Sequence, residues 1–224
     1  MIFLQWLFES HLHFGSKSIA VREVIGGVLG LASAILAARR MIVAWPVGIL
    51  GDALLFTVFL GAIFTFGDPN DARNFYGQAG RNLLLIVVSL YGWSRWLSHQ
   101  RRGVNAVPVE PRWSTTRERI FIVPTFLVFF ALSFLLFRWL GESGEWLLVD
   151  TWIFSGTALA TWGMSKGYVE FWLVWIAVDI VGVPFALSNG YYPTGILYAL
   201  YMPFVIWGFL RWLQISRRHD LISQ

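Results

Sequence analysis

The stretch VEFWLVWIAVDIVGVP, from Val169 to Pro184, decides the fold because it is almost entirely apolar over nearly the length of a membrane span. About 20 mostly apolar residues in a helix cross the hydrocarbon core of a bilayer. Apart from Glu170 at its start, the stretch contains one charged residue, Asp179. A carboxylate at that depth costs about 3 kcal/mol, so it normally faces protein, water or a ligand. The sequence therefore predicts a membrane helix with one polar face.

The same apolar character extends over the whole chain of 224 residues. Hydrophobic residues make up 57% of it and charged residues only 13%, and the mean hydropathy is +0.61, whereas soluble domains are about 25% charged. The net charge of +4 comes from Lys and Arg between apolar runs, where basic residues set membrane topology. We therefore expect an all-α integral membrane protein that contacts the lipid bilayer and binds no nucleic acid.

Seven apolar segments are long enough to be membrane helices. They are expected at Val21–Ala38, Ile42–Phe66, Gly80–Leu97, Ile120–Leu140, Trp146–Met164, Val169–Ser188 and Tyr192–Leu213. An outer N-terminus places twelve of the seventeen Lys and Arg on the cytoplasmic side, together with the C-terminus. The first 20 residues predict an amphipathic interfacial helix rather than a cleaved signal peptide.

The two halves of the chain share short motifs in the same order. Trp45 precedes Asp52 by seven residues, as Trp172 precedes Asp179, and both halves end in G-x-x-R-W-L. Gly30 and Gly156 also occupy comparable positions in the first helix of each half. The seven spans then form a 3+1+3 parallel-repeat arrangement, a design known among transporters. We expect an interfacial segment at 1–20, a first three-helix repeat at 21–97, a basic cytoplasmic linker and connecting helix at 98–145, a second repeat at 146–213 and a cytoplasmic tail at 214–224.

Three residues of the opening stretch share one face of its helix. Trp172, Trp175 and Asp179 stand at i, i+3 and i+7. Two aromatic surfaces and a hydrogen-bond acceptor in one stripe suit a planar heterocycle or a ribose. Alternatively, Asp179 caps a broken helix or pairs with an arginine, and the tryptophans belong to the interfacial belt. We expect substrate binding at all three residues.

The third predicted helix also carries polar residues on one face. Gln78, Asn82 and Ser89 follow helical spacing, with Arg81 beside them. Asn82 lies too deep to reach the membrane surface, so it is a candidate for substrate binding together with Gln78. We expect Arg81 to extend its long side chain to the outer surface instead.

Two tyrosines and a second aspartate complete the candidate substrate-binding residues. Tyr198 and Tyr201 share a face of the last predicted helix with Thr194. Their hydroxyls can face a polar cavity, although rings packed against small residues would give the same pattern. Asp52 repeats the place of Asp179 in the first half, where it either serves the cavity or links two helices.

The sequence argues against several other functions. It contains no G-x-x-x-x-G-K-[ST] loop for nucleotide hydrolysis and no cysteine, and all four histidines lie outside the predicted spans. It shows no cluster of metal ligands and no nucleophile with a matching base. We therefore expect a transporter with no catalytic residue, cofactor or metal. A membrane enzyme or a structural membrane subunit is the less favoured alternative.

Four motifs together resemble the PnuC family of bacterial vitamin transporters. They are WPVGI (45–49), YGW (91–93), FWLVWIAVD (171–179) and GYYPTGILYALY (190–201), and the resemblance extends from Val21 to Leu213. It implies a homotrimer in the bacterial cytoplasmic (inner) membrane that takes up a vitamin by facilitated diffusion, with trapping by a cytoplasmic kinase. By this resemblance, ligand contacts fall on Trp172, Trp175, Asp179, Asn82 and Tyr198.

The substrate follows from where the chain departs from one branch of that family. Nicotinamide riboside carriers have Asn directly before W-x-x-W, where this chain has Phe171, and SNGYYPTG departs from their pattern too. The chain is more similar to the riboflavin-carrying branch, the RibM or PnuX type. An aromatic residue suits a three-ring isoalloxazine better than a pyridinium riboside. We therefore expect riboflavin, with nicotinamide riboside or thiamine on the same fold as the alternative.

Overall fold

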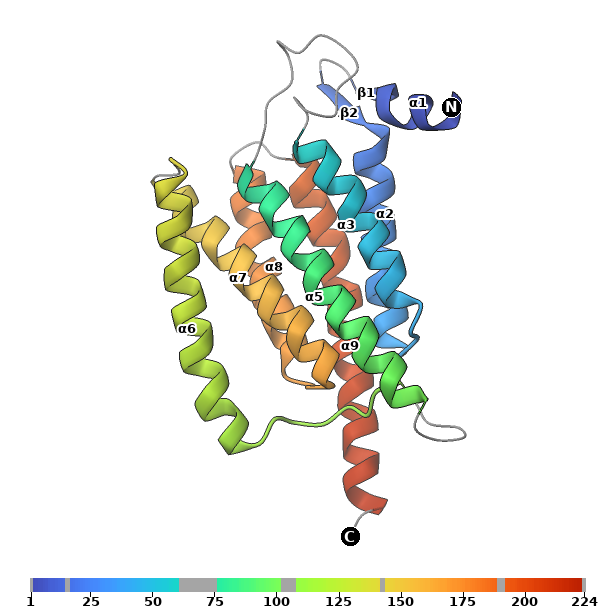
Figure 1. Ribbon diagram of the computed structural model, residues 1–224, viewed down its shortest axis with the longest axis vertical. Coiled ribbons are helices and arrows are strands. Elements are labelled where there is room, and N and C mark those ends of the chain that lie inside the picture. The colour runs from blue at the N-terminus through green and yellow to red at the C-terminus, as the bar shows by residue number, and fades with distance from the viewer. Residues whose placement is uncertain are drawn as a thin grey trace.

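The computed structural model describes residues 2–14, 17–60, 76–101, 108–141, 144–188 and 192–222, which are almost entirely helical (Figure 1). The helices are α1 Ile2–Glu9, α2 Val21–Ala38, α3 Ala44–Phe59, α5 Tyr76–Gln100, α6 Thr116–Trp139, α7 Glu145–Lys166, α8 Phe171–Ser188 and α9 Tyr192–Ile222; the strands are β1 His11–Phe14 and β2 Lys17–Ala20. Each predicted membrane segment overlaps one of the helices from α2 to α9. Helix α9 continues to Ile222, beyond the predicted end at Leu213, and the last residues of the predicted segment Ile42–Phe66 lie outside the described residues.

Three helices of the described residues are long and apolar enough to cross a membrane by themselves. These segments are Val21–Ala38, Thr116–Trp139 and Gly195–Arg218, and α3 and α8 supply shorter apolar helices. The helices α5 and α7 contain more polar side chains, such as Arg81, Asn82 and Thr151. The chain is therefore a multi-pass membrane protein in which some helices turn a polar face inward.

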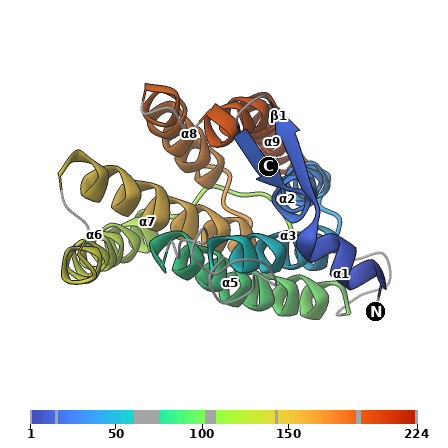
Figure 2. The ribbon, with the colours of Figure 1, turned by 90° about the horizontal axis from the view of Figure 1, so that it is seen from above.

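Six helices pack in a closed ring, in the order α2, α3, α5, α7, α8 and α9, with α9 returning to α2. Figure 2, which looks along the bundle, shows this ring with α6 outside it, beside α7. In this order α3 lies opposite α8, and α5 lies opposite α9. Three ring helices precede α6 in the chain and three follow it.

The segment that leads into α6 is fixed to the turn between α7 and α8. The backbone N–H of Arg112 donates to the Gly167 carbonyl, and the N–H of Val169 donates to the Arg112 carbonyl, both at 2.9 Å. Gly167 adopts φ 83°, the left-handed conformation that ends many helices. A Cβ there would stand 2.7 Å from the carbonyl oxygen of Glu110, so glycine also permits this close approach.

Side chains strengthen the same attachment. Arg112 donates two hydrogen bonds to the Glu118 carboxylate, at 2.7 and 2.9 Å, and the Tyr168 hydroxyl donates to it at 2.6 Å. Burial, followed by the hydrogen bond to Glu118, raises the pKa of Tyr168 to about 12. The hydroxyl of Ser114 also bonds the Glu170 carboxylate. These contacts hold the start of α8, the helix that carries Trp172.

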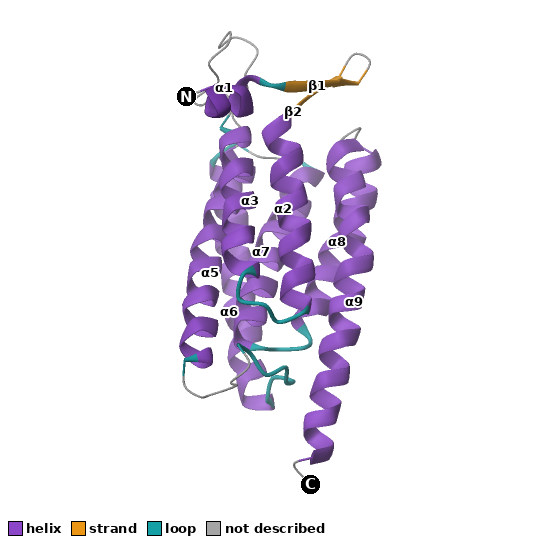
Figure 3. Cartoon of the chain, turned by 90° about the vertical axis from the view of Figure 1, so that its right-hand side faces the viewer, coloured by secondary structure: helices purple, strands orange, loops and turns teal. Residues whose placement is uncertain are grey.

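The N-terminal segment differs from the single interfacial helix that we expected. Helix α1 ends at Glu9, and an antiparallel hairpin follows, with His11 paired to Ala20 and Phe14 to Lys17. Figure 3 shows both at the same end of the bundle. HLHF alternates polar and apolar residues with the period of a strand, which agrees with pairing rather than with a continued helix.

Candidate functional site

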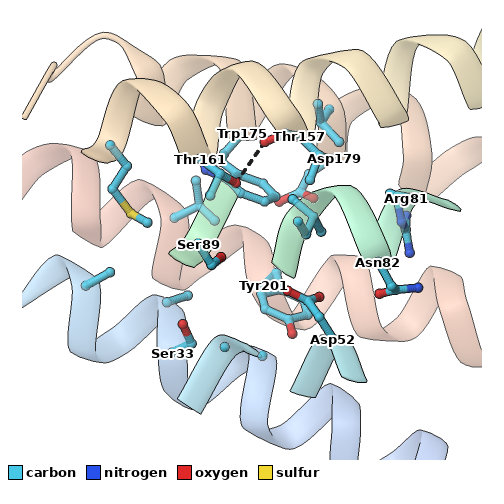
Figure 4. Close-up of a pocket in the computed structure, with 18 of the residues that line it drawn as sticks. Ser33, Asp52, Arg81, Asn82, Ser89, Thr157, Thr161, Trp175, Asp179 and Tyr201 are labelled. Atoms are coloured by element: carbon cyan, nitrogen blue, oxygen red, sulfur yellow. Dashed lines mark hydrogen bonds between the residues drawn. The ribbon is translucent and has the colours of Figure 1, made fainter. Parts of the chain in front are cut away.

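The ring encloses a cavity that is lined by all six of its helices. Its empty space is about 1070 Å³, including the space at its mouth. The lining residues are Gly30, Ser33, Ala34 and Ala37 of α2; Trp45, Gly48, Asp52 and Leu55 of α3; Arg81, Asn82, Leu85 and Ser89 of α5; Thr157, Thr161 and Met164 of α7; Trp172, Trp175, Val178 and Asp179 of α8; and Leu197, Tyr198, Tyr201 and Val205 of α9. Figure 4 shows that the labelled polar side chains converge from helices of both halves.

Seven of the eight residues predicted to bind substrate line this cavity. They are Trp172, Trp175, Asp179, Asn82, Tyr198, Asp52 and Tyr201. Asn82 and Asp179 are almost completely buried, with 1% and 3% of their surface exposed. The side chain of Gln78 lies outside the described residues. The structure thus brings the seven together, while their contact with a substrate stays a prediction.

The cavity uses equivalent positions in the two halves of the chain. The number of residues from Trp45 to Trp172 equals the number from Asp52 to Asp179. A second constant interval relates Arg81, Asn82, Leu85 and Ser89 of α5 to Leu197, Tyr198, Tyr201 and Val205 of α9. On α2 and α7 the matching residues are Gly30 with Thr157, Ala34 with Thr161 and Ala37 with Met164. Gly30 is therefore equivalent to Thr157 rather than to its neighbour Gly156.

At the level of Trp175, the wall opposite this aromatic side chain is built of small residues. Trp175 lies on α8, and its equivalent on the opposite helix α3 is Gly48. Ala34 of α2 continues the small-residue wall. A Cβ on Gly48 would stand 2.8 Å from the Ser33 hydroxyl oxygen, so the wall is closely packed behind this position. The space between a tryptophan ring and such a wall suits a flat ligand.

Four tryptophans form the end of the cavity at which α3 and α8 begin. Trp45 meets Trp96 at 5.2 Å between ring centroids, Trp172 meets Trp212 at 5.4 Å, and Trp96 meets Trp212 at 6.4 Å. None of the four is more than 3% exposed. Trp45 and Trp172 line the cavity, and the other two lie behind them.

This tryptophan cluster explains the repeated sequence motifs. A Cβ on Gly92 would stand 2.3 Å from the Trp45 ring, and one on Gly208 would stand 2.5 Å from the Trp172 ring. Glycine in G-x-x-R-W-L therefore makes room for the tryptophan that precedes the aspartate in the same half. The motif's own tryptophan, Trp96 or Trp212, meets its equivalent across the ring.

The polar contact between Arg81 and Tyr198 also crosses the ring. Arg81 Nη1 of α5 donates to the Tyr198 hydroxyl of α9 at 2.7 Å. Our expectation that Arg81 extends to the outer surface was therefore wrong. Arg81 lies on the face of α5 that lines the cavity, and its Nε is buried. The neighbouring Tyr201 donates its hydroxyl to the Gly27 carbonyl at 3.0 Å, which holds α9 against α2.

Comparison with known proteins identifies the family. The family model described as nicotinamide mononucleotide transporter matches residues 20–214. This chain belongs to that family, the PnuC family. The chain is 32% identical over 218 residues to the riboflavin/roseoflavin transporter RibM of Streptomyces davaonensis, over 96% of this chain and 95% of that one. Its fold matches the crystal structure of the vitamin B3 transporter PnuC with a TM-score of 0.69 at 19% identity, covering 88% of this chain and 83% of the other.

The PnuC-family cavity contains polar residues that the sequence analysis did not select. Thr157 and Thr161 line it from α7, and the Thr161 hydroxyl donates to the Thr157 carbonyl at 2.8 Å (Figure 4). Ser33 lines it from α2 and donates to the Ala44 carbonyl at 2.8 Å. The repeat could have located both threonines, because the spacing that relates Asp52 to Asp179 also relates Gly30 to Thr157 and Ala34 to Thr161.

The charges of this PnuC-family cavity are separated rather than paired. Asp179 Oδ2 is buried and has no hydrogen-bond partner among the described residues. No described carboxylate lies within ion-pair distance of Arg81, and Asp52 contributes a further carboxylate to the lining. Separated donors and acceptors can bind the polar groups of an uncharged solute. Like its relatives, the chain is a transporter rather than an enzyme.

Proposed function

We propose that the chain takes up riboflavin by facilitated diffusion. The observation that carries the proposal is the cavity in which Trp175 stands opposite small residues and Trp45 and Trp172 line one end, where a three-ring isoalloxazine can lie flat. The 32% identity to the riboflavin/roseoflavin transporter RibM, over nearly the whole of both chains, supports the same substrate. Phe171, which distinguishes the chain from nicotinamide riboside carriers in sequence, packs against Trp162 and Tyr168 outside the cavity lining, so it does not contact the ligand in this proposal.

In this proposal the predicted residues contact different parts of the ligand. Trp175 and Trp172 stack on the ring system, and Asp179 accepts hydrogen bonds from the ribityl hydroxyls with its unpartnered oxygen. Asn82, buried on α5, supplies an amide from the other half. Asp52 contributes a further acceptor; Tyr198, Tyr201 and Gln78 complete the substrate-binding residues.

We assign the transport pathway to seven membrane spans in a 3+1+3 parallel repeat. The boundaries are those expected from the sequence, with repeats at 21–97 and 146–213. The packing supports this division, because the ring takes three helices from each half and α6 stands outside it. Movement of one half against the other would open the central site to one side at a time. A cytoplasmic kinase then traps the vitamin by phosphorylation.

We place the protein in the bacterial cytoplasmic membrane, with the N-terminus outside and the C-terminus inside. The distribution of basic residues supports this orientation. We also propose a homotrimer, as in the family. The apolar side chains of α6 that lie outside the ring, such as Phe121 and Leu132, are 74% and 60% exposed and leave a face for lipid or a neighbouring copy.

Two measurements on the purified protein test the substrate. Riboflavin fluorescence should be quenched on binding, because the flavin would stack on tryptophan. Liposomes that contain only this protein should accumulate labelled riboflavin to equilibrium and no further, without an ion gradient or nucleotide. Absence of both binding and uptake would contradict the proposed function, and uptake above equilibrium would contradict facilitated diffusion.

Nicotinamide riboside is the second candidate, with thiamine behind it. The description of the family model and the vitamin B3 transporter among the structural matches favour a nicotinamide compound. The two separated carboxylates, Asp52 and Asp179, would also tolerate a cationic ring. Titration of the protein's tryptophan fluorescence with each vitamin in turn distinguishes the candidates, since tight binding of nicotinamide riboside without binding of riboflavin would reverse the assignment.

A further inference from the structure

The guanidinium of Arg81 is incompletely bonded for a charged group inside a protein. Guanidinium has five N–H donors, and among the described residues Arg81 makes one hydrogen bond, from Nη1 to the Tyr198 hydroxyl at 2.7 Å. The Nε is buried and makes no hydrogen bond to the described residues. Charged groups inside proteins are normally paired or fully hydrogen-bonded. Arg81 therefore has donors available to another molecule.

Arg81 lines the cavity that holds the proposed ligand. Arg81 and its neighbour Asn82 line the same cavity as Trp175 and Asp179, but they come from α5 in the other half of the chain (Figure 4). Tyr198 holds the guanidinium from the opposite helix, α9. A ligand stacked on the aromatic wall therefore shares its compartment with an arginine fixed in one orientation.

We propose that Arg81 is a specificity-determining residue that donates hydrogen bonds to a carbonyl oxygen on the ring edge of the ligand, with Tyr198 as the residue that positions it. The inference rests on the proposed transport of riboflavin, whose ring edge carries two carbonyl oxygens on either side of an N–H. The planar donors of arginine fit such acceptors better than a lysine ammonium does.

The charge of Arg81 should also make the cavity bind the two candidate substrates with different affinities. Nicotinamide riboside carries a permanent positive charge on its pyridinium ring, whereas riboflavin is neutral. A fixed guanidinium in the same cavity repels the first and binds the second. Without Arg81, the cavity would keep Asp52 and Asp179 and would favour a cation. Arg81→Gln should consequently weaken riboflavin binding and strengthen nicotinamide riboside binding.

The decisive experiment combines a variant with a ligand analogue. Wild type, Arg81→Gln and Arg81→Lys are titrated with riboflavin, 2-thioriboflavin and 4-thioriboflavin, in which sulfur replaces one carbonyl oxygen and accepts hydrogen bonds only weakly. Wild type should lose about 10- to 100-fold in affinity for one analogue, the range for a hydrogen bond to a charged group. Both variants should bind riboflavin and that analogue nearly equally.

Each outcome has a defined meaning. Equal loss of affinity for all three ligands in Arg81→Gln would assign Arg81 to structure alone and overturn the inference, while riboflavin binding by wild type would leave the proposed function standing. No riboflavin binding by wild type would overturn both. Arg81→Lys keeps the charge and covers the case in which Arg81→Gln does not fold. Arg117→Gln, at an exposed position on α6, is the matched control and should behave as wild type.

Tyr198→Phe tests the positioning role. The variant keeps the guanidinium and removes the hydroxyl that accepts its hydrogen bond. It should reduce the preference for riboflavin over the discriminating thio-analogue, because Arg81 is no longer held toward that carbonyl. A purely structural role for Tyr198 would lower both affinities and leave their ratio unchanged, and that result would remove Tyr198 from the inference.

Discussion

At the scale of single residues, Trp175 should contribute most of the stacking surface, because its equivalent across the ring is Gly48. We predict that Trp175→Ala weakens riboflavin binding by about 0.5–1.5 kcal/mol, or about 2- to 12-fold in Kd. Fluorescence titration measures the change. Trp139→Ala is the control, because Trp139 is 81% exposed on α6. Unchanged affinity in a folded Trp175→Ala protein would assign Trp175 to packing.

Asp179 raises a separate question, because a buried carboxylate can act through its charge or through its hydrogen-bonding oxygens. The proposed role, acceptance of hydroxyl protons, needs an oxygen but no charge. We predict that Asp179→Asn retains riboflavin uptake in liposomes within about 10-fold, while Asp179→Leu abolishes it. If Asn were as inactive as Leu, the negative charge would be required, and a neutral hydrogen-bonding role would be refuted.

The residues that could be assigned from the sequence are those for which spacing along one helix is sufficient. Trp172, Trp175 and Asp179 share a face of one helix, and all three line the cavity. Arg81 could not be assigned this way, since its partner Tyr198 belongs to a distant helix. A long arginine side chain near a helix end can extend to the membrane surface or into the protein interior, and only tertiary packing selects between the two.

At the scale of helices, the close contact between glycine and tryptophan makes a prediction about stability. The alanine Cβ of Gly92→Ala would meet the Trp45 ring, which is buried and cannot retreat. We predict a loss of about 1–3 kcal/mol in the free energy of unfolding, measured as a lower thermal midpoint. Gly80→Ala on the same helix meets no atom within 4 Å, so it should be neutral or slightly stabilising. Equal effects of the two variants would contradict this account.

The positions of the helices were largely predictable, because runs of apolar residues report directly on membrane helices. The end of α9 at Ile222 was not, because its last residues are mostly polar and lie beyond the apolar run. The hairpin of β1 and β2 was not, since four-residue strands are too short to stand out beside the apolar segments. The attachment of the linker at Arg112 to the turn at Gly167 was also hidden, because it depends on backbone hydrogen bonds between distant segments. Local patterns therefore predicted the elements but not the contacts between their ends.

At the scale of the whole molecule, the repeat was detected from motifs whose physical meaning only the packing explains. Trp45 and Gly92 are far apart in the sequence, yet they form one contact, and Trp172 with Gly208 forms its equivalent. The two halves then meet through Trp96 and Trp212. Because this contact joins opposite helices of the ring, opening that end of the cavity requires the two tryptophans to separate.

We predict that this separation can be followed with spin labels, since the chain has no native cysteine and single cysteines can be introduced freely. Labels at Ser98 of α5 and Gln214 of α9, both exposed, lie just beyond Trp96 and Trp212. Their distance distribution should gain a longer component when riboflavin is added, if the halves move apart at this end. Labels at Val43 and Ser98 lie within one half and should keep a single distance. A labelled protein that still transports riboflavin while the first pair stays fixed would refute movement between rigid halves.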